Sequence, residues 1–223
     1  MLAPPVVRGG IVARWASLVL GLFLFALGVV LLLESKLGLS PWDVLSQGIA
    51  KHSPLSFGNA NIAVALVVLV VAWRLGARIG PGTVANALLI GLFIDGLLAI
   101  RGVHRLAQGS LPVRVCELAG GVLIVGAASG LYIGAALGAG PRDSLMLVLA
   151  RRTGVRVGAV RAGLEISATA AGFALGGKVG VGTLAFALGI GPAVEASFWA
   201  LGRTPLALPA VPAPAPASTI GQA

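Results

Sequence analysis

The sequence predicts an all-α polytopic membrane protein, built from two tandem repeats of about 100 residues. Hydrophobic residues make up 57% of the 223 residues and charged residues only 10%, whereas soluble domains average about 45–50% and about 25%. Apolar segments long enough to cross a bilayer recur along the chain, and the second half repeats motifs of the first. This composition excludes a soluble enzyme, a secreted disulfide scaffold and a disordered protein.

Six apolar segments come close to the roughly 20 residues that a helix needs to cross a hydrocarbon core of about 30 Å. Two further apolar segments, 41–50 and 141–150, have ten residues each, which as helices would rise about 15 Å. We predict half-helices there, although spans extended to Lys51 and Arg152 are an alternative. The six predicted long spans are 14–33, 59–75, 82–100, 114–136, 158–176 and 182–200.

Shifting the chain by 100 residues aligns its two halves without a gap, and 22 of the 89 pairs over 14–102 are identical. Gly38-Leu-Ser-Pro-Trp-Asp-Val-Leu45 matches Gly138-Ala-Gly-Pro-Arg-Asp-Ser-Leu145. Each repeat is therefore predicted to be a long helix, a short half-helix and two more long helices. The repeats are inverted if the half-helices do not cross the bilayer, and parallel if they do. Both arrangements place more basic residues inside when the N-terminus is cytoplasmic.

The predicted organisation has five parts. Because the first span has a counterpart in the second half and no cleavage site follows it, we expect a retained helix rather than a signal peptide. The Pro- and Ala-rich end lacks helical periodicity and is predicted to be disordered. The parts are an N-terminal segment 1–13, repeat 14–101, linker 102–113, repeat 114–202 and tail 203–223.

The chain has seven acidic residues, and two of them, Asp43 and Asp143, occupy the same place in the two repeats. In the first repeat, Ser40 suits the N-cap of a helix, Pro41 its first position, and the acid after Trp42 faces the free amides of the first turn. Either both acids only satisfy a helix start where water is absent, or two half-helix N-termini meet near the bilayer midplane as a polar site. The second copy is Gly140-Pro141-Arg142-Asp143, in which Arg142 could pair with an acid or an anionic substrate.

A second pair of acids, Asp95 and Glu195, ends a pattern of small residues at four-residue steps. The small residues allow close helix approach, and an acid about 18 Å beyond the start of the helix lies beyond mid-membrane. Its carboxyl group should therefore face protein or a water-filled cavity. It is either a protonated or arginine-paired packing acid or an ion- or proton-coupled site. The two patterns are Thr83, Ala87, Gly91, Asp95 and Thr183, Ala187, Gly191, Glu195. Glu165, four residues after Arg161, is predicted to form a local ion pair.

The formal net charge of +9 indicates anchoring in anionic lipid rather than nucleic-acid binding, because the basic residues lie at the ends of apolar segments. A single cysteine, Cys116, with two histidines gives no zinc-ligand pattern. We expect no metal, no cofactor and no enzymatic activity.

The box Gly38–Leu45, followed about forty residues later by Gly-x-Gly-Thr and a helix with an intramembrane acid, resembles the YczE/YyaS/YitT group of bacterial integral membrane proteins. The resemblance covers 14–202, and the lack of a soluble C-terminal domain favours the YczE-like branch. It implies a multi-span protein of the bacterial cell membrane and no particular substrate.

The leading hypothesis is a small secondary transporter or permease with a site for an unknown small molecule or ion at the repeat interface. The candidate binding residues are Asp43, Asp95, Asp143, Glu195, Thr83, Thr183, Trp42 and Arg142. Residues expected to shape the backbone around them are Ser40, Pro41, Gly80, Gly82, Gly91, Gly140, Pro141, Gly180, Gly182 and Gly191. The alternatives are a non-transporting accessory or scaffold protein that forms a homo-oligomer through its small-residue faces, and a substrate-binding subunit of a larger importer.

Overall fold

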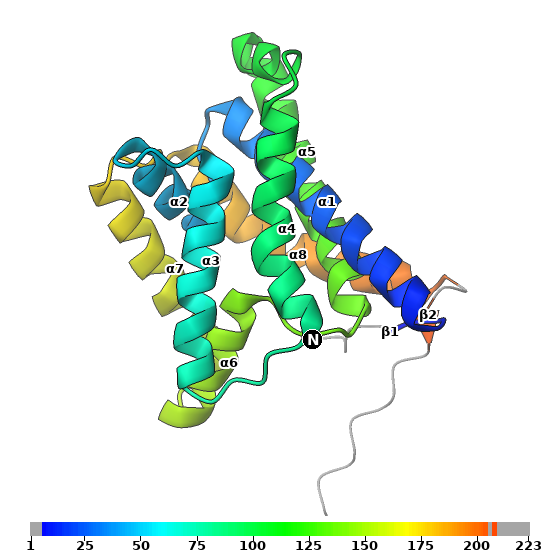
Figure 1. The fold of residues 1–223 in the computed structure, drawn as a ribbon. Helices are drawn as coiled ribbons and strands as arrows, with labels where there is room; N and C mark the ends of the chain where they lie inside the picture. The colour runs from blue at the N-terminus through cyan, green and yellow to red at the C-terminus, as the bar shows by residue number, and fades with distance from the viewer. Residues whose placement is uncertain (1–5, 205–206, 209–223) are drawn as a thin grey trace, which may run out of the picture.

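The computed structural model describes residues 6–204 and 207–208, with only the backbone described at residues 105, 107, 207 and 208. The described chain is almost entirely helical (Figure 1). Its helices are α1 (Ile11–Ser35), α2 (Pro41–Lys51), α3 (Phe57–Arg74), α4 (Pro81–Leu98), the 3-10 helix η1 (Val103–Gln108), α5 (Leu111–Gly134), α6 (Pro141–Thr153), α7 (Val157–Ala174) and α8 (Val181–Gly202).

Among the described residues, five helices are long and apolar enough to cross a membrane: α1, α3, α4, α5 and α8. The chain is therefore a multi-pass membrane protein. α7 has the required 18 residues, but Arg161 and Glu165 lower its mean hydropathy, so the sixth long span stays a prediction. The two short helices α2 and α6 begin at the predicted prolines and contain 11 and 13 residues.

The longest helices, α1 and α5, pack against each other in opposite directions. Nε of Arg14 donates to the carbonyl of Ala135 at 2.7 Å, and Nε of Arg114 donates to the carbonyl of Ser35 at 2.6 Å. Glycine lets the two backbones approach closely: a Cβ at Gly28 would lie 2.9 Å from the carbonyl oxygen of Gly121. Each helix therefore holds the end of the other.

Helices α4 and α8 begin against the loops that follow α5 and α1. The amide of Gly82 donates to Leu137 at 2.9 Å, and that of Gly182 donates to Leu37 at 2.8 Å. Gly38 and Gly138, which follow those two leucines, have φ of +137° and +134°, where side chains other than hydrogen are strained. Thr83 and Thr183, the third residue of each helix, accept the amide hydrogens of Gly80 and Gly180 at 3.2 and 3.3 Å.

The short helices pack against long helices from the opposite half of the chain: α2 lies along α7 and α6 lies along α3. The end of each short helix is tied to the end of its partner. Nζ of Lys51 donates to the carbonyl of Gly176, and Nε of Arg152 donates to that of Leu75 at 2.8 Å. The two halves are thus interleaved rather than side by side.

The ends of the helices define two faces of the molecule. The face that we call the N-terminal face carries the start of α1, the ends of α5 and α8 and the starts of α4 and α7 (Figure 1). The two-residue strands β1 (Val6–Val7) and β2 (Ala207–Leu208) pair there. The remainder of the predicted tail after residue 208, and residues 1–5 and 205–206, lie outside the described residues.

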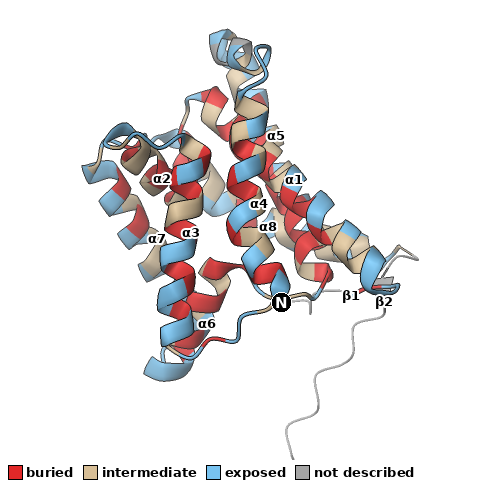
Figure 2. Ribbon diagram, in the orientation of Figure 1, coloured by how far each residue is buried: buried red, intermediate tan, exposed pale blue. Residues whose placement is uncertain are grey.

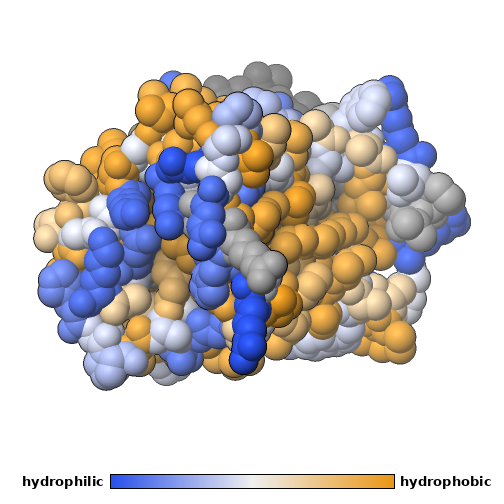
Figure 3. Space-filling view, turned by 90° about the horizontal axis from the view of Figure 1, so that it is seen from above, coloured by the Kyte–Doolittle hydropathy of each residue, from blue (hydrophilic) through white to orange (hydrophobic). Residues whose placement is uncertain are grey.

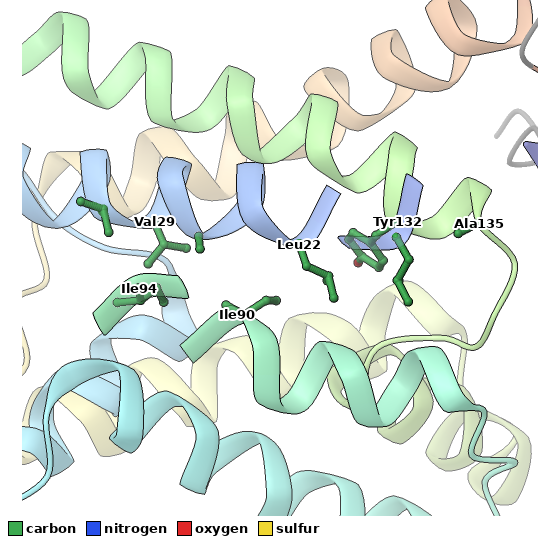
Figure 4. Packing of buried hydrophobic residues seen from close by; sticks show 9 residues of the cluster. Leu22, Val29, Ile90, Ile94, Tyr132 and Ala135 are labelled. Carbon is green, nitrogen blue, oxygen red and sulfur yellow. The ribbon is translucent and has the colours of Figure 1, made fainter. Parts of the chain in front are cut away.

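The largest buried cluster joins α1, α4 and α5. Leu22 and Val29 of α1 contact Ile90 and Ile94 of α4, with Tyr132 of α5 beside them (Figure 4). Buried residues follow the centre of the bundle (Figure 2), while many large apolar side chains are exposed on the outside (Figure 3). An apolar exterior is what a lipid environment requires.

Candidate functional site

A cavity of about 170 Å³ lies where the N-termini of α2 and α6 meet. The long helices line it with residues from near the middle of their lengths: Phe25, Ala65, Ile90, Val125 and Ile190. A helix that crosses a bilayer has its middle near the midplane. The cavity therefore lies at the depth where water is least available to polar groups.

At the start of α2, the carboxylate of Asp43 is buried, with 1% of the residue exposed. Ser40 is the N-cap and donates its hydroxyl to Oδ2 of Asp43, whose own amide reaches the serine oxygen at 3.4 Å. Asn61 of α3 donates its side-chain amide to Oδ1 at 3.1 Å. The carboxylate thus joins the start of α2 to α3.

At the start of α6, the corresponding carboxylate has fewer partners. Gly140 is the N-cap and supplies no side chain. Oδ2 of Asp143 accepts the hydroxyl of Tyr132 at 3.4 Å, a distance at the weak end for such a bond. Both Tyr132 and Asp143 line the cavity, so this acid has lone pairs available to a solute or a proton.

Arg142 connects the two helix starts. Its Nη2 lies 3.9 Å from Oδ1 of Asp43, and its guanidinium carbon lies 5.2 Å from the centre of the Trp42 ring. A guanidinium over an indole face is a favourable cation–π contact. Trp42 and Arg142 stand at positions 100 residues apart, and the contact between them joins the two halves of the chain.

α7 brings a second ion pair to the cavity wall. Nε of Arg161 donates to Oε1 of Glu165 at 2.9 Å, which confirms the predicted local pair. Arg142 and Arg161 both line the cavity, and each is paired with an acid: Arg142 with Asp43, which is buried behind the lining, and Arg161 with Glu165, which is part of it. A third acid, Asp143, lines the cavity and makes no ion pair with any described residue. With every group ionised, the site carries one excess negative charge.

The arrangement can hold a small polar solute. Donor groups come from Asn86 and the arginines, while the hydroxyls of Ser129 and Tyr132 already donate to Val125 and Asp143. The acceptor with free capacity is Asp143. Apolar side chains such as Phe25 and Ile190 exclude water from the rest of the cavity wall. A few polar groups converging in an otherwise apolar cavity are typical of small-molecule sites.

Asp95 lies away from this cavity. Its Oδ1 accepts the amide of Gly58 at 2.8 Å, and its other oxygen accepts the hydroxyl of Ser56. The carboxylate of α4 therefore binds the first turn of α3, a position favoured by the positive end of that helix.

The structure leaves Glu195 on α8 exposed, so the four predicted acids do not share one site. Thr83 and Thr183 are buried and bind the helix starts described above rather than the cavity. Of the eight predicted binding residues, the structure brings together Asp43, Asp143, Trp42 and Arg142.

Several cavity residues were not singled out from the sequence. Asn61 binds Asp43, and its counterpart one repeat later is Arg161. A polar residue at the same position of both halves could have indicated a functional position, but asparagine and arginine differ in type. When the chain is shifted by 100 residues, Tyr132 is aligned with Leu32 and Asn86 with Phe186. Neither residue has a polar counterpart in the other half, so the comparison of the halves does not mark them.

Comparison with known proteins places the chain among membrane proteins. Residues 12–197 match a family described as a family of unknown function (DUF6198). The chain is 35% identical over 181 residues to the uncharacterized membrane protein YczE of Bacillus subtilis, covering 80% of this chain and 82% of YczE. It is 37% identical over 191 residues to an uncharacterized protein of Haemophilus influenzae, covering 83% and 86%, and 24% identical over 168 residues to YyaS of Bacillus subtilis, covering 74% and 82%. No solved structure matches.

Proposed function

Since this chain belongs to the DUF6198 family of YczE- and YyaS-like membrane proteins, whose function is unknown, we propose from its cavity that it is a small secondary transporter. It carries a small polar or charged solute across the bacterial cell membrane, coupled to a proton or another cation, and it is not an enzyme. The observation that carries the proposal is the meeting of two half-helix N-termini, with Asp43, Arg142 and Asp143, at mid-depth of an apolar bundle.

The proposal includes a tandem repeat of inverted topology. It is supported by the opposite directions of α1 and α5 and by the contacts that recur at positions 100 apart, such as those of Gly82 and Gly182. Transporters built from inverted repeats bind their substrates between the repeats near the midplane, at discontinuous helices. The short helices α2 and α6, whose starts line one cavity, support the same arrangement for this chain.

Asp143 is the proposed coupling group. A carboxylate at this depth is costly unless it is paired, hydrated or protonated, and Asp143 has only the Tyr132 hydroxyl and the charges of neighbouring arginines to offset that cost. Binding a proton or a cation removes the excess negative charge of the cavity. Asp43 has a different role, because its hydrogen bonds and ion pair hold the site together.

The orientation that we propose places the N-terminal face in the cytoplasm. It is supported by the larger number of basic residues that this orientation leaves inside. Arg14, Arg151, Arg152 and Arg203 all lie at helix ends on this face.

The test is solute-driven proton movement in proteoliposomes that contain a trapped pH-sensitive dye. The solutes are a panel of sodium, potassium, ammonium, chloride, acetate, glycine and lysine, added one at a time. We expect at least one solute to change the internal pH in vesicles with the protein and not in empty vesicles. Asp143→Asn should abolish that signal, because the amide cannot take up the proton.

The matched control is Glu117→Gln, which removes a buried carboxylate of α5 that does not line the cavity. This variant should keep the signal. A signal that survives Asp143→Asn unchanged would refute the coupling role, and the absence of any solute-dependent signal or solute-dependent thermal shift across a widened panel would refute transport.

A further inference from the structure

One helix contact of the first half has no counterpart in the second half. α3 packs along α4, whereas the corresponding helices α7 and α8, both described in full, hardly touch. The other principal contacts occur in both halves: α1 packs on α4 as α5 packs on α8, and α2 packs on α7 as α6 packs on α3. The difference is confined to one side of the bundle.

The contact between α3 and α4 is tight, and it closes the bundle at the face opposite the N-terminal face. A Cβ at Gly58 would lie 2.2 Å from the carbonyl of Gly91, and a Cβ at Gly91 would lie 2.4 Å from the carbonyl of Gly58. Only glycine fits such a backbone contact. Asp95 binds the first turn of α3 on the same side, through Ser56 and the amide of Gly58. We call this contact the Asp95 gate.

The same positions in the second half are open. A Cβ at Gly158 or at Gly191 would meet nothing within 4 Å, and Glu195 is exposed. Only 11% of the apolar stretch of α8 is buried, against 33% for α4. The second half thus has the counterparts of the two glycines and the acid that join α3 to α4, but these counterparts make no contact between α7 and α8.

The opening adjoins the cavity. α7 lines it with Leu164 and Glu165, and α8 lines it with Phe186 and Val194, yet the two helices do not pack on each other. The cavity wall is therefore interrupted between them. Because α7 starts and α8 ends at the N-terminal face, the interruption leads toward that face (Figure 1).

We propose that the structure is one of two states, and that in the other state α7 closes on α8. Glu195 then binds the first turn of α7 through Arg156 and the amide of Gly158, as Asp95 binds that of α3, while the Asp95 gate opens. We call the new contact the Glu195 gate. The inference rests on the proposed transport function and supplies its mechanism, since two gates that close in turn expose one cavity to each face alternately.

The chain has features that suit this movement. Pro192 lies inside α8, one turn before Glu195, and a proline in a helix removes a backbone hydrogen bond and eases bending there. At the corresponding position of α4 the residue is Leu92. Arg156 is the counterpart of Ser56 and could form an ion pair with Glu195. Closure of α7 on α8 would therefore pair the carboxylate of Glu195, which is exposed in this structure.

The experiment is disulfide crosslinking in membranes, in a Cys116→Ser background that removes the native thiol. The variant Arg156→Cys/Glu195→Cys reports the Glu195 gate, and the matched pair Ser56→Cys/Asp95→Cys reports the Asp95 gate. Copper phenanthroline should crosslink both pairs, although only the second is in contact in this structure. Absence of the first crosslink, while the second forms, would overturn the proposal.

A second measurement uses Met146→Cys in the same background, since Met146 lines the cavity. A membrane-impermeant maleimide applied at the N-terminal face should label it. Weakening the Asp95 gate by Asp95→Ala, or by the milder Ser56→Ala, should lower that labelling and raise labelling from the opposite face. Glu195→Ala should not lower it. Labelling that is unchanged by Asp95→Ala and by Ser56→Ala would overturn the proposal.

These measurements need no solute and are therefore independent of the transport assay. If the crosslinks form and the labelling shifts but no solute-driven flux is found, the two gates are supported and transport is refuted. Flux without the crosslink between positions 156 and 195 would support transport and refute the Glu195 gate.

Discussion

Nη2 of Arg142 lies 3.9 Å from Oδ1 of Asp43, so an ion pair joins the starts of the two short helices. The pair is set in an apolar bundle, where each charge alone would be costly. Asn61 and Ser40 satisfy the carboxylate further, and Trp42 covers the guanidinium. The contact holds the two halves in register around the cavity.

Removing one partner of this ion pair should destabilise the protein strongly. Asp43→Ala leaves the Arg142 guanidinium without its carboxylate, and a buried pair broken in this way costs about 3–5 kcal/mol of the free energy of unfolding. Denaturation of the purified protein in detergent measures the change. Asp43→Ala/Arg142→Ala should cost less than the sum of the two single changes, because residues in contact are coupled.

The second ion pair of the cavity serves as a comparison. Arg161 is half exposed, so Arg161→Ala should change the free energy of unfolding by no more than about 1 kcal/mol. Equal losses for Arg161→Ala and Asp43→Ala would contradict the view that the Asp43 pair holds the halves together.

Two glycines should respond to serine in opposite ways. At Gly140, the N-cap of α6, a Cβ would meet only atoms at 3.4 Å or more, and a serine there would supply the missing cap. We expect Gly140→Ser to raise stability by a few tenths of a kcal/mol, the usual gain of a serine over a glycine cap. Thermal unfolding in detergent is the measurement.

At Gly80, a Cβ would lie 2.4 Å from the carbonyl of Leu137. The backbone must shift to admit it, so Gly80→Ser should cost about 1–3 kcal/mol, as overpacking does. Similar thermal stability for the Gly80 and Gly140 variants would show that the contact between α4 and the loop after α5 is looser than the structure has it.

The two buried threonines should have structural roles of equal size. Thr83→Val and Thr183→Val each remove one acceptor for a glycine amide at a helix start, at a cost of about 1 kcal/mol. Thr83→Ser and Thr183→Ser keep the hydroxyl and should retain most of the stability. Loss of solute-driven flux at full stability in the valine variants would contradict this assignment and favour a binding role.

The cavity should be reachable by water-soluble reagents. In a Cys116→Ser background, Met146→Cys should react with a small charged thiol reagent, because Met146 lines the cavity. Val148→Cys, on the same helix, should not react, because Val148 is 2% exposed and packs in the core between α3 and α6. Equal reaction rates at the two positions would mean that the cavity is closed to water or that α6 is not packed as described.

Much of the local structure could be predicted because its causes lie within a few residues. Pro41 and Pro141 begin the short helices as expected, and Ser40 caps the first of them, because capping depends on side chains within one turn. α8 extends through Gly202, two residues beyond the predicted span. The resemblance to the YczE and YyaS proteins is confirmed.

The roles of the paired acids could not be predicted in the same way. Asp143 lines the cavity and Asp43 lies behind its wall, paired with Arg142, but Asp95 binds the start of α3 and Glu195 is exposed. The four-residue spacing of small residues indicated that α4 and α8 approach other helices closely, and Gly91 does so. Its counterpart Gly191 meets nothing within 4 Å, although the two sequences around them are alike.

The sequence by itself determined the membrane class, the positions of the helices and the recurrence of their motifs, because hydropathy, capping and repetition are properties of neighbouring residues. Only the tertiary structure decided that α2 packs on α7 and α6 on α3, that Arg142 reaches Asp43, and that α3 meets α4 while α7 and α8 stay apart. The physical reason is that the apolar helices are almost equally hydrophobic all round, so hydropathy does not select their partners. Close backbone approach and a few buried polar contacts do.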